Sequence, residues 1–432
     1  AKARGEARVL SFDMGGTTAK TCVVHDAQPA VTTEFEVART YRFKQGSGLP
    51  LRVPVVDLIE IGAGGGSLVH VDALGLLKVG PESASADPGP ACYGRGGTHA
   101  TVTDADLVLG YLGADSFLGG RMKLDLAAAR AAIERDVAKP LKINVEQAAR
   151  GVHDIVNENM TNASRVQAVE RGHDPSGHVL VAFGGAGPVH AWGVAKKLGV
   201  ERIIVPPSPG VGSAYGLLLA PRALRLARTY IGTLETLDWS KVEAAFAEMR
   251  AEAVAALAQA GVPERAIRFE PSADLRYLGQ RKELMVTLPG LSFSAKSRAS
   301  IGEAFEKRYE AIYHRRHAGH PIEALAWRLH AFGPATMAAP RAKRTSVTRR
   351  APVPKTMRPM FFDGWSRHRS CPVYSRYALA TGMTIDGPAV IEEDEASTVV
   401  GPGGRLTVDA FGHLVITLPQ AKQRLRRRRG AR

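Results

Sequence analysis

The stretch that decides the fold is residues 8–24, which read RVLSFDMGGTTAKTCVV. A short apolar run leads to Asp13, a Gly-Gly-Thr-Thr turn follows, and a second apolar run ends the stretch. Two apolar runs separated by a glycine-rich segment are typical of a β-hairpin. We therefore predict two strands joined by an oxygen-rich turn.

The turn of this hairpin has the composition of a phosphate-binding loop. Gly15 and Gly16 have no Cβ, so their backbone N–H groups can approach a phosphate closely, and Thr17 and Thr18 add hydroxyl donors. Asp13, at the end of the strand, can bind Mg²⁺ directly or through water, or orient an attacking water. The alternative interpretation is a tight hairpin in which Asp13 only caps the turn.

A second glycine turn follows a buried-type strand at residues 179–183, in the string VLVAFGGAGP. A strand that runs through a glycine turn into a helix presents backbone amides to a nucleotide. The predicted ligands are Gly184, Gly185, Ala186 and Gly187. The spacing does not match the dinucleotide fingerprint G-x-G-x-x-G, and the sequence has no G-x-x-x-x-G-K-[ST] string, which excludes the P-loop class.

Three further side chains invite a chemical role. Asp104 lies at the end of a Gly- and Pro-rich loop over residues 80–104 and can act as an acid or base or simply cap a turn. His190 directly follows the second glycine turn at the start of a predicted helix, where it can meet a ligand, although a lone histidine is often structural. Cys92 has no adjacent base and is interpreted as a small buried thiol.

The order of predicted strands and helices indicates an α/β protein. Helical periodicity is strongest over residues 145–171, and further elements alternate along the chain. The expected organisation is an α/β domain over residues 1–230, an α+β domain over 231–340, a basic proline-containing linker over 341–360, a small β-rich domain over 361–418 and a basic disordered tail over 419–432.

The charge of the chain argues for solvated basic segments. The formal net charge is +15, and much of the excess lies in residues 341–358 and 422–429. Like-charged runs outside the apolar segments are usually mobile and solvated, so we do not expect a nucleic-acid partner.

No apolar run approaches the ~20 residues that span a bilayer, no signal peptide is evident, and the cytoplasm is the expected location. Cys22, Cys92 and Cys371 show no metal-binding or disulfide pattern.

Several strings taken together resemble the hydantoinase A/oxoprolinase family. The matching strings span residues about 8 to 418 in the same order as in the family, which makes the resemblance specific. They are SFDMGGTTAK at 11–20, IGAGGGS at 61–67, VGPES at 79–83, ADPGP at 86–90, YGRGG at 93–97, TVTDA at 101–105, FGGAGP at 183–188, SAYG at 213–216, RYLGQ at 276–280 and DGPAVIE at 386–392.

The resemblance implies an actin-like (ribonuclease H-like) ATPase lobe followed by a mixed α+β C-terminal region. Residues 13–18 would be the second phosphate loop and residues 184–187 the adenosine loop. The family's first phosphate loop, an Asp-x-Gly-Gly-Thr string near its N-terminus, does not occur before residue 13 here, so the sequence resembles an N-terminally truncated member with half a nucleotide site. Lys20 also stands where several members have Asp.

The resemblance further implies a subunit of an ATP-dependent hydrolase that opens a small cyclic amide such as hydantoin or 5-oxoproline. ATP and Mg²⁺ or another divalent metal would be the cofactors, and a hydantoinase B-like subunit would be the partner in a hetero-oligomer. Two alternatives remain open: a ketone carboxylase subunit of the acetone or acetophenone type, and a catalytically silent assembly subunit. A third, binding of nucleic acid through the arginine-rich tail, is not favoured.

Overall fold

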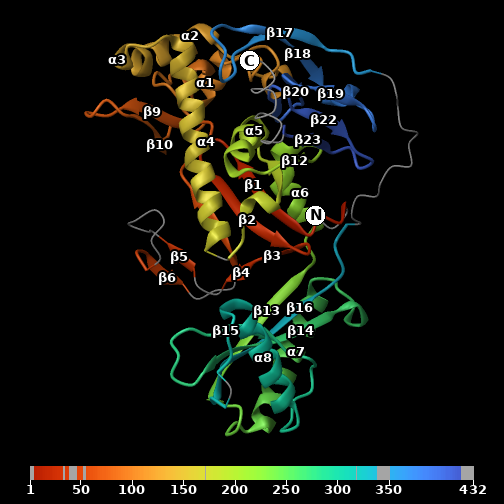
Figure 1. Ribbon diagram of the computed structural model, residues 1–432. Coiled ribbons are helices and arrows are strands. Elements are labelled where there is room, and N and C mark those ends of the chain that lie inside the picture. Colours follow the sequence, from red (N-terminus) through yellow and green to blue (C-terminus); the bar gives the residue numbers. More distant parts are fainter. Residues whose placement is uncertain are drawn as a thin grey trace, which may run out of the picture. The chain divides into compact units, whose positions relative to one another are not determined.

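The predicted hairpin is present in the computed structural model of the chain (Figure 1). Strands β1 (Arg8–Met14) and β2 (Ala19–His25) pair antiparallel, with Asp13 opposite Lys20. The structure describes residues 4–32, 35–37, 46–51, 55–170, 172–317, 319–337 and 351–419.

The chain divides into two units, of which the first contains the hairpin. Unit 1 comprises Ala1–Tyr215 and Pro340–Arg432, and unit 2 comprises Gly216–Ala339. This division differs from the predicted one, because the residues expected to form a separate C-terminal domain over 361–418 belong to unit 1. The first boundary falls at residue 215 rather than 230. The run at 341–350 and the tail at 420–432 lie outside the described residues.

A nine-stranded mixed sheet forms the centre of unit 1, in the order β19-β22-β23-β12-β11-β1-β2-β3, with β8 also paired to β2. The three central strands β1, β11 and β12 run parallel, and their neighbours are antiparallel. The remaining strands of this sheet are β3 (Gln28–Pro29), β8 (Leu58–Ile61), β11 (Val179–Phe183), β12 (Arg202–Val205), β19 (Thr384–Asp386), β22 (Arg405–Val408) and β23 (Leu414–Thr417).

The late strands enter the sheet because β23 pairs with β12, more than 200 residues earlier in the chain. Ile203 lies opposite Ile416, and both are buried in the core that also holds Leu10, Phe12 and Leu180. Burial of apolar side chains on neighbouring strands is the main favourable term for such a pairing. The C-terminal segment is therefore part of the same core as the hairpin.

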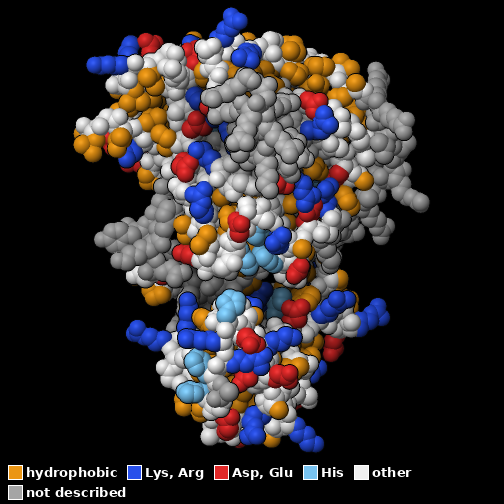
Figure 2. Space-filling model, viewed as in Figure 1, with side chains coloured by type: hydrophobic (Ala, Val, Ile, Leu, Met, Phe, Trp, Pro, Cys, Tyr) orange, Lys and Arg blue, Asp and Glu red, His pale blue; other side chains and the backbone are white. Residues whose placement is uncertain are grey.

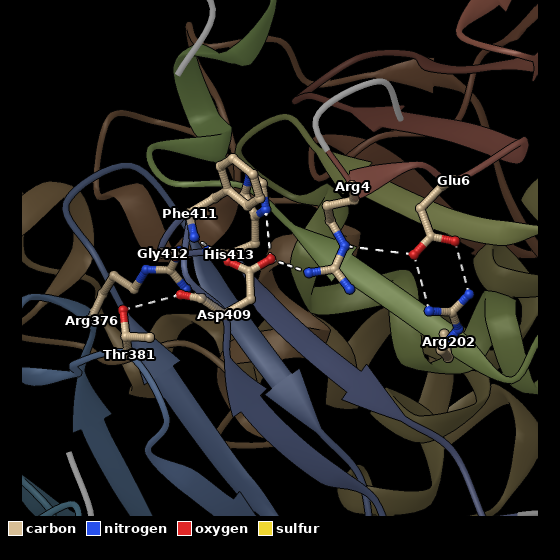
Figure 3. Close-up of polar contacts among 9 residues, drawn as sticks. All are labelled: Arg4, Glu6, Arg202, Arg376, Thr381, Asp409, Phe411, Gly412 and His413. Atoms are coloured by element: carbon tan, nitrogen blue, oxygen red, sulfur yellow. Dashed lines mark hydrogen bonds and ion pairs between the residues drawn. The ribbon is translucent and has the colours of Figure 1, made fainter. Parts of the chain in front are cut away.

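Ion pairs reinforce this connection at one edge of the sheet (Figure 3). Arg202 of β12 donates two hydrogen bonds to Glu6, at 3.0 and 2.8 Å, and Arg4 pairs with both Glu6 and Asp409. Asp409 also accepts from the His413 ring at 3.0 Å. Networks of this kind fix geometry more than they add stability. They tie the start of the chain to the β22–β23 hairpin.

Helices of unit 1 pack on the sheet and on one another. The longest, α4 (Val145–Val169), begins with a capping box formed by Asn144 and Gln147 and contacts β2, β8 and α5. The helix α5 (Gly187–Leu198) connects β11 to β12 and ends at Gly199. The other helices are α1 (Val102–Val108), α2 (Leu126–Ile133), α3 (Lys139–Leu141) and α6 (Gly212–Leu219).

Smaller strand pairs complete unit 1. A four-stranded sheet has the order β17-β18-β20-β21, in which β18 and β20 are parallel. Its strands are β17 (Thr356–Met360), β18 (Arg369–Ser375), β20 (Ala389–Glu392) and β21 (Ser397–Val400), and the two-stranded pairs are β9 (Ser67–Val71) with β10 (Leu77–Ser83), β4 (Val31–Thr32) with β7 (Val55–Val56), and β5 (Phe35–Val37) with β6 (Leu49–Leu51).

Unit 2 is an α+β arrangement with its own core. Its antiparallel sheet has the order β13-β16-β14-β15. Trp327 of β16 is fully buried and packs against Phe246 of α7, in a core that also holds Phe305 of α8. The elements are β13 (Ala223–Thr233), α7 (Trp239–Gln259), β14 (Arg268–Tyr277), β15 (Leu284–Thr287), α8 (Ser297–Tyr313) and β16 (Ile322–Phe332).

Two surface properties bear on the expected partners. On the face shown in Figure 2, Lys and Arg side chains are interspersed with Asp and Glu side chains over much of the described surface. Among the helices that the structure describes, none is both long and apolar enough to cross a bilayer.

Candidate functional site

The two predicted glycine turns meet at one edge of the central sheet. Strands β1 and β11 are parallel neighbours with Asp13 beside Phe183, so both turns follow the carboxyl ends of adjacent strands. The N–H of Ala186 donates to the Met14 carbonyl at 3.0 Å. Ligands of α/β proteins bind at this edge of a parallel sheet. The two turns therefore adjoin in the structure, whereas their role in nucleotide binding stays a prediction.

The second turn depends on a glycine at its first position. Gly184 has φ +83°, and a Cβ there would stand 2.3 Å from the Met14 carbonyl oxygen and 2.5 Å from Asp13 Oδ1. Glycine alone combines this conformation with so close an approach. The space beside Gly15 and Gly16 is open, since no atom lies within 4 Å of a Cβ built on either residue.

A third glycine-rich segment, residues 62–66, supports the first turn from behind. The N–H groups of Gly65 and Gly66 donate to the carbonyls of Gly15 and Gly16 at 3.0 and 2.6 Å. The Thr103 hydroxyl in turn donates to the Gly65 carbonyl at 2.8 Å. The carbonyl groups of Gly15 and Gly16 therefore already accept hydrogen bonds from the protein backbone. The family string at 61–67 thus has a structural role at this turn.

Asp13 lies half-buried at the end of β1, next to both turns. Its Oδ2 accepts a hydrogen bond from the Ser213 hydroxyl at 3.1 Å. One carboxylate with a hydroxyl beside it fits Mg²⁺, which is commonly held by one or two carboxylates together with waters and substrate phosphates. Lys20 donates to the Thr18 hydroxyl at 2.8 Å and pairs with Glu60 of β8 at 3.2 Å, so its charge is held within the sheet.

Sequence reasoning missed an acidic turn at residues 393–396, between β20 and β21, which packs on both the second glycine turn and the Ser208–Gly210 segment. The Ser208 N–H donates to Glu393 Oε2 at 3.1 Å, and a Cβ on Gly185 would lie 3.5 Å from the Glu395 carbonyl oxygen. Burial raises the pKa of Glu393 to about 7, in spite of the nearby Arg376 charge. A carboxyl group that titrates near neutrality is suited to proton transfer.

Asp104 is fully buried and acts as an anchor. Its carboxylate accepts hydrogen bonds from the N–H groups of Ala91, Cys92 and Thr101 and from the Thr101 hydroxyl, at 2.7 to 3.2 Å. Thr101 caps the helix α1. These contacts give no support to the expected catalytic role of Asp104. Burial, and then the charge of Asp104, raise the pKa of the buried Cys92 thiol, which fits the predicted inert cysteine.

His190 lies in the first turn of α5, as expected, but its ring is fully buried and points toward α1 and α4. Its Nε2 is 3.0 Å from Asp106 Oδ2, and Asp106 Oδ1 is 2.7 Å from Nδ1 of His153. The expected contact of His190 with a ligand at the glycine turn therefore finds no support. Within the described part of the chain, Asp106, His153 and His190 form a group whose side chains could hold a metal ion.

The pKa values in this cluster follow from burial and mutual charge. Burial opposes ionisation of Asp106, but the neighbouring His190 and the hydrogen bond from His153 outweigh it and hold the pKa of Asp106 well below its usual range. Burial lowers the pKa of His153 to about 4, and the neighbouring His190 acts in the same direction. The carboxylate is therefore ionised inside the core.

A cavity of about 920 Å³ lies beside the acidic turn. Its lining includes Glu392, Glu393, Lys355 and Arg358. Glu392 accepts from the Ser116 hydroxyl at 2.6 Å and from Lys355 at 3.1 Å, and it also pairs with Arg358. The cavity is large enough for a small organic substrate. Glu393 belongs both to this wall and to the segment that contacts the second glycine turn.

The fold and this site define a class: a mixed α/β protein in which two glycine turns adjoin at the ends of parallel strands. Family models match at two places, "Hydantoinase/oxoprolinase" over residues 1–225 and "Hydantoinase/oxoprolinase C-terminal domain" over residues 234–417. The chain belongs to the hydantoinase/oxoprolinase family, as the sequence predicted.

Named relatives have several different activities. The caprolactamase subunit alpha of Pseudomonas jessenii is 32% identical over 404 residues, which cover 93% of this chain and 57% of that protein. 5-Oxoprolinase 1 of Arabidopsis thaliana is 30% identical, with 96% and 33% covered. A nucleotide-free structure of acetone carboxylase superposes with a TM-score of 0.78 at 25% identity, covering 96% of this chain and 58% of that one. The chain thus spans less than two thirds of each.

Proposed function

We propose that the chain is the nucleotide-binding part of an ATP-dependent enzyme that opens a small cyclic amide, such as a hydantoin, a lactam or 5-oxoproline. The observation that carries the proposal is the junction of the two glycine turns, with the Ala186 N–H bonded to the Met14 carbonyl at 3.0 Å. Caprolactamase and 5-oxoprolinase among the relatives support the substrate class. We also propose the actin-like arrangement of this lobe, in which residues 13–18 and 184–187 bind phosphate and adenosine. Because the N–H groups of Gly184 and Ala186 donate to the carbonyls of Pro209 and Met14, the backbone contacts to adenosine would come from Gly185 and Gly187.

Each element of the site has a role in this proposal. The Gly15 N–H donates to the Thr18 carbonyl inside the turn, at 3.1 Å, so the N–H groups of Gly16 and Thr17 would bind phosphate oxygens in the open space beside Gly15 and Gly16. The N-terminus of α5 adds its helix dipole, which favours a bound anion. Asp13 would hold Mg²⁺, which neutralises charge on the phosphates, and the Ser213 hydroxyl fixes the orientation of that carboxylate. Positioning and charge stabilisation provide most of the catalysis in phosphoryl transfer.

The reaction balances as two hydrolyses coupled through phosphate. The amide oxygen attacks the γ-phosphorus and ADP leaves, which gives a phosphorylated imidate. Water adds to the ring carbon, the carbon–nitrogen bond breaks, and an acyl phosphate forms; a second water releases phosphate. In this scheme Glu393, whose pKa is about 7, is the residue near the turns best suited to accept or donate a proton.

A second candidate is ATP-dependent carboxylation of a ketone, favoured by the TM-score of 0.78 to acetone carboxylase. It uses the same nucleotide turns and differs in the phosphorylated substrate. In either case we propose a hydantoinase B-like partner in a hetero-oligomer, since relatives carry subunit designations. If the chain serves only for assembly, nucleotide turnover is absent.

The test is ATP turnover with a substrate panel. The chain is assayed for ADP release with hydantoin, caprolactam, 5-oxoproline, or acetone plus bicarbonate, each with and without a family N-terminal segment and a hydantoinase B-like subunit. We expect amide-dependent ADP release that Asp13→Asn abolishes and that the matched variant Asp238→Asn, at a helix cap in unit 2, leaves unchanged. Release only with ketone and bicarbonate supports the carboxylase, and no release with any combination contradicts both.

A further inference from the structure

Three buried side chains on three helices of unit 1 converge on one point. Asp106 of α1, His153 of α4 and His190 of α5 are 2%, 4% and 0% exposed. Each offers one ligand atom, and these atoms lie within 4.8 Å of one another. The two imidazole rings are stacked with centroids 4.5 Å apart, so both present a nitrogen to the same carboxylate.

The hydrogen-bond geometry of His190 has room for a bound cation. Its Nε2 lies 3.0 Å from Asp106 Oδ2, and its Nδ1 lies 2.9 Å from Asn157 Oδ1. A neutral imidazole has one N–H group. With the Asn157 Oδ1 atom turned toward the ring, both ring nitrogens face an oxygen atom. The nitrogen that carries no proton would then face an oxygen lone pair with no hydrogen between the two atoms. Three arrangements resolve this contact: a second proton on the ring, a rotated Asn157 amide, whose Nδ2 otherwise has no hydrogen-bond partner, or a metal ion beside Nε2.

The surroundings of His190 match those of a metal ligand. Histidines that bind metals usually donate their other ring N–H to an oxygen acceptor, which fixes the tautomer. Asn157 Oδ1 is placed to accept from Nδ1, and this leaves the Nε2 lone pair directed at Asp106. Two imidazoles and one carboxylate are a donor set for zinc and similar transition metals, whereas Mg²⁺ and Ca²⁺ prefer oxygen ligands and water.

We propose that Asp106, His153 and His190 form a binding site for one divalent transition-metal ion of the zinc class. The ion joins α1, α4 and α5 inside the core of unit 1. Because α5 begins at Gly187, within the second glycine turn, the ion also fixes the helix that carries this turn. The site is separate from the Mg²⁺ site proposed at Asp13 and stands without the proposed function.

Metal content gives the first test. The full chain is produced with zinc, passed through gel filtration and analysed by mass spectrometry for bound metals, and we expect about one ion per chain. Asp106→Asn and His190→Gln should each lower this to about a tenth or less, and Asn157→Ala should weaken zinc affinity about 10- to 100-fold. The matched variant His413→Gln, whose ring bonds to Asp409 elsewhere in unit 1, should retain the ion.

A spectroscopic test on the unaltered chain covers the case in which the variants fail to fold. Cobalt-substituted protein should show visible d–d absorption with an intensity that reports coordination by nitrogen and oxygen. X-ray absorption should give two histidine ligands at about 2.0–2.1 Å. A chain that holds no zinc or cobalt after folding in their presence, or that holds metal equally well after Asp106→Asn, overturns the proposal. The cluster would then be an imidazolium–carboxylate pair.

Discussion

Replacement of Gly184 by alanine tests the contact between the two glycine turns. Gly184 has φ +83°, and an added Cβ would stand 2.3 Å from the Met14 carbonyl oxygen and 2.5 Å from Asp13 Oδ1. The left-handed backbone costs an alanine about 1–2 kcal/mol. Forcing a methyl group into a packed region costs roughly another 1–3 kcal/mol. We therefore expect Gly184→Ala to destabilise unit 1 by about 2–5 kcal/mol in total.

The matched variant is Gly75→Ala. Gly75 has φ +76° in the turn between β9 and β10, and no atom lies within 4 Å of a Cβ built there. It incurs the backbone cost of about 1–2 kcal/mol and no steric cost. Urea unfolding of both variants and the unaltered chain, with hydrogen exchange of peptides from β1 and β11 to follow unit 1, provides the comparison. Equal destabilisation by the two substitutions would refute the close approach of Gly184 to Asp13 and Met14.

Three further predictions follow from buried groups. The pKa of Glu393 is raised from 4.5 to about 7, so the folded state binds more protons than the unfolded state between these pH values, and the stability of the protein falls as pH rises through them. The gain in stability from Glu393→Gln should therefore grow over that window to on the order of 3 kcal/mol. A gain that does not change with pH would contradict the raised pKa of Glu393. Asp104→Asn should lower the free energy of unfolding by about 2–4 kcal/mol, as measured by thermal unfolding. Asp125→Asn exchanges one good N-cap of α2 for another and should change it by no more than about 0.5 kcal/mol. Equal losses of stability would contradict the anchor role of Asp104. The three cysteines are buried, so a thiol reagent should label none of them before denaturation, and rapid labelling of Cys92 in the native protein would be the opposite result.

The sequence was most informative where a backbone requirement selects glycine. The strings at 15–18 and 184–187 were recognisable because open turns after apolar strands need residues without a Cβ. The helix α5 begins at Gly187, inside the glycine turn, and Pro188 falls in its first turn, where proline is favoured.

The sequence was least informative where distant segments meet. Asp106 contacts His153 and His190 across 47 and 84 residues, and the acidic turn at Glu393 reaches Ser208 across 185. The spacing of residues along the chain does not reveal contacts between distant segments. In the hydrophobic periodicity of a helix, a buried histidine cannot be distinguished from any other polar residue. The entry of β22 and β23 into the central sheet was missed for the same reason, because short alternating strands equally describe a separate domain.

The central claim is that the two glycine turns bind one nucleotide together. Hydrogen exchange of the chain with and without ATP and Mg²⁺ tests it most directly, by comparing peptides that contain residues 14–18 and 184–187. The account predicts that ATP slows exchange in both peptides over the same concentration range, and that Gly16→Ala, which fills open space without touching other atoms, removes this protection from both. Protection of one turn alone, or of neither at saturating ATP, would contradict it.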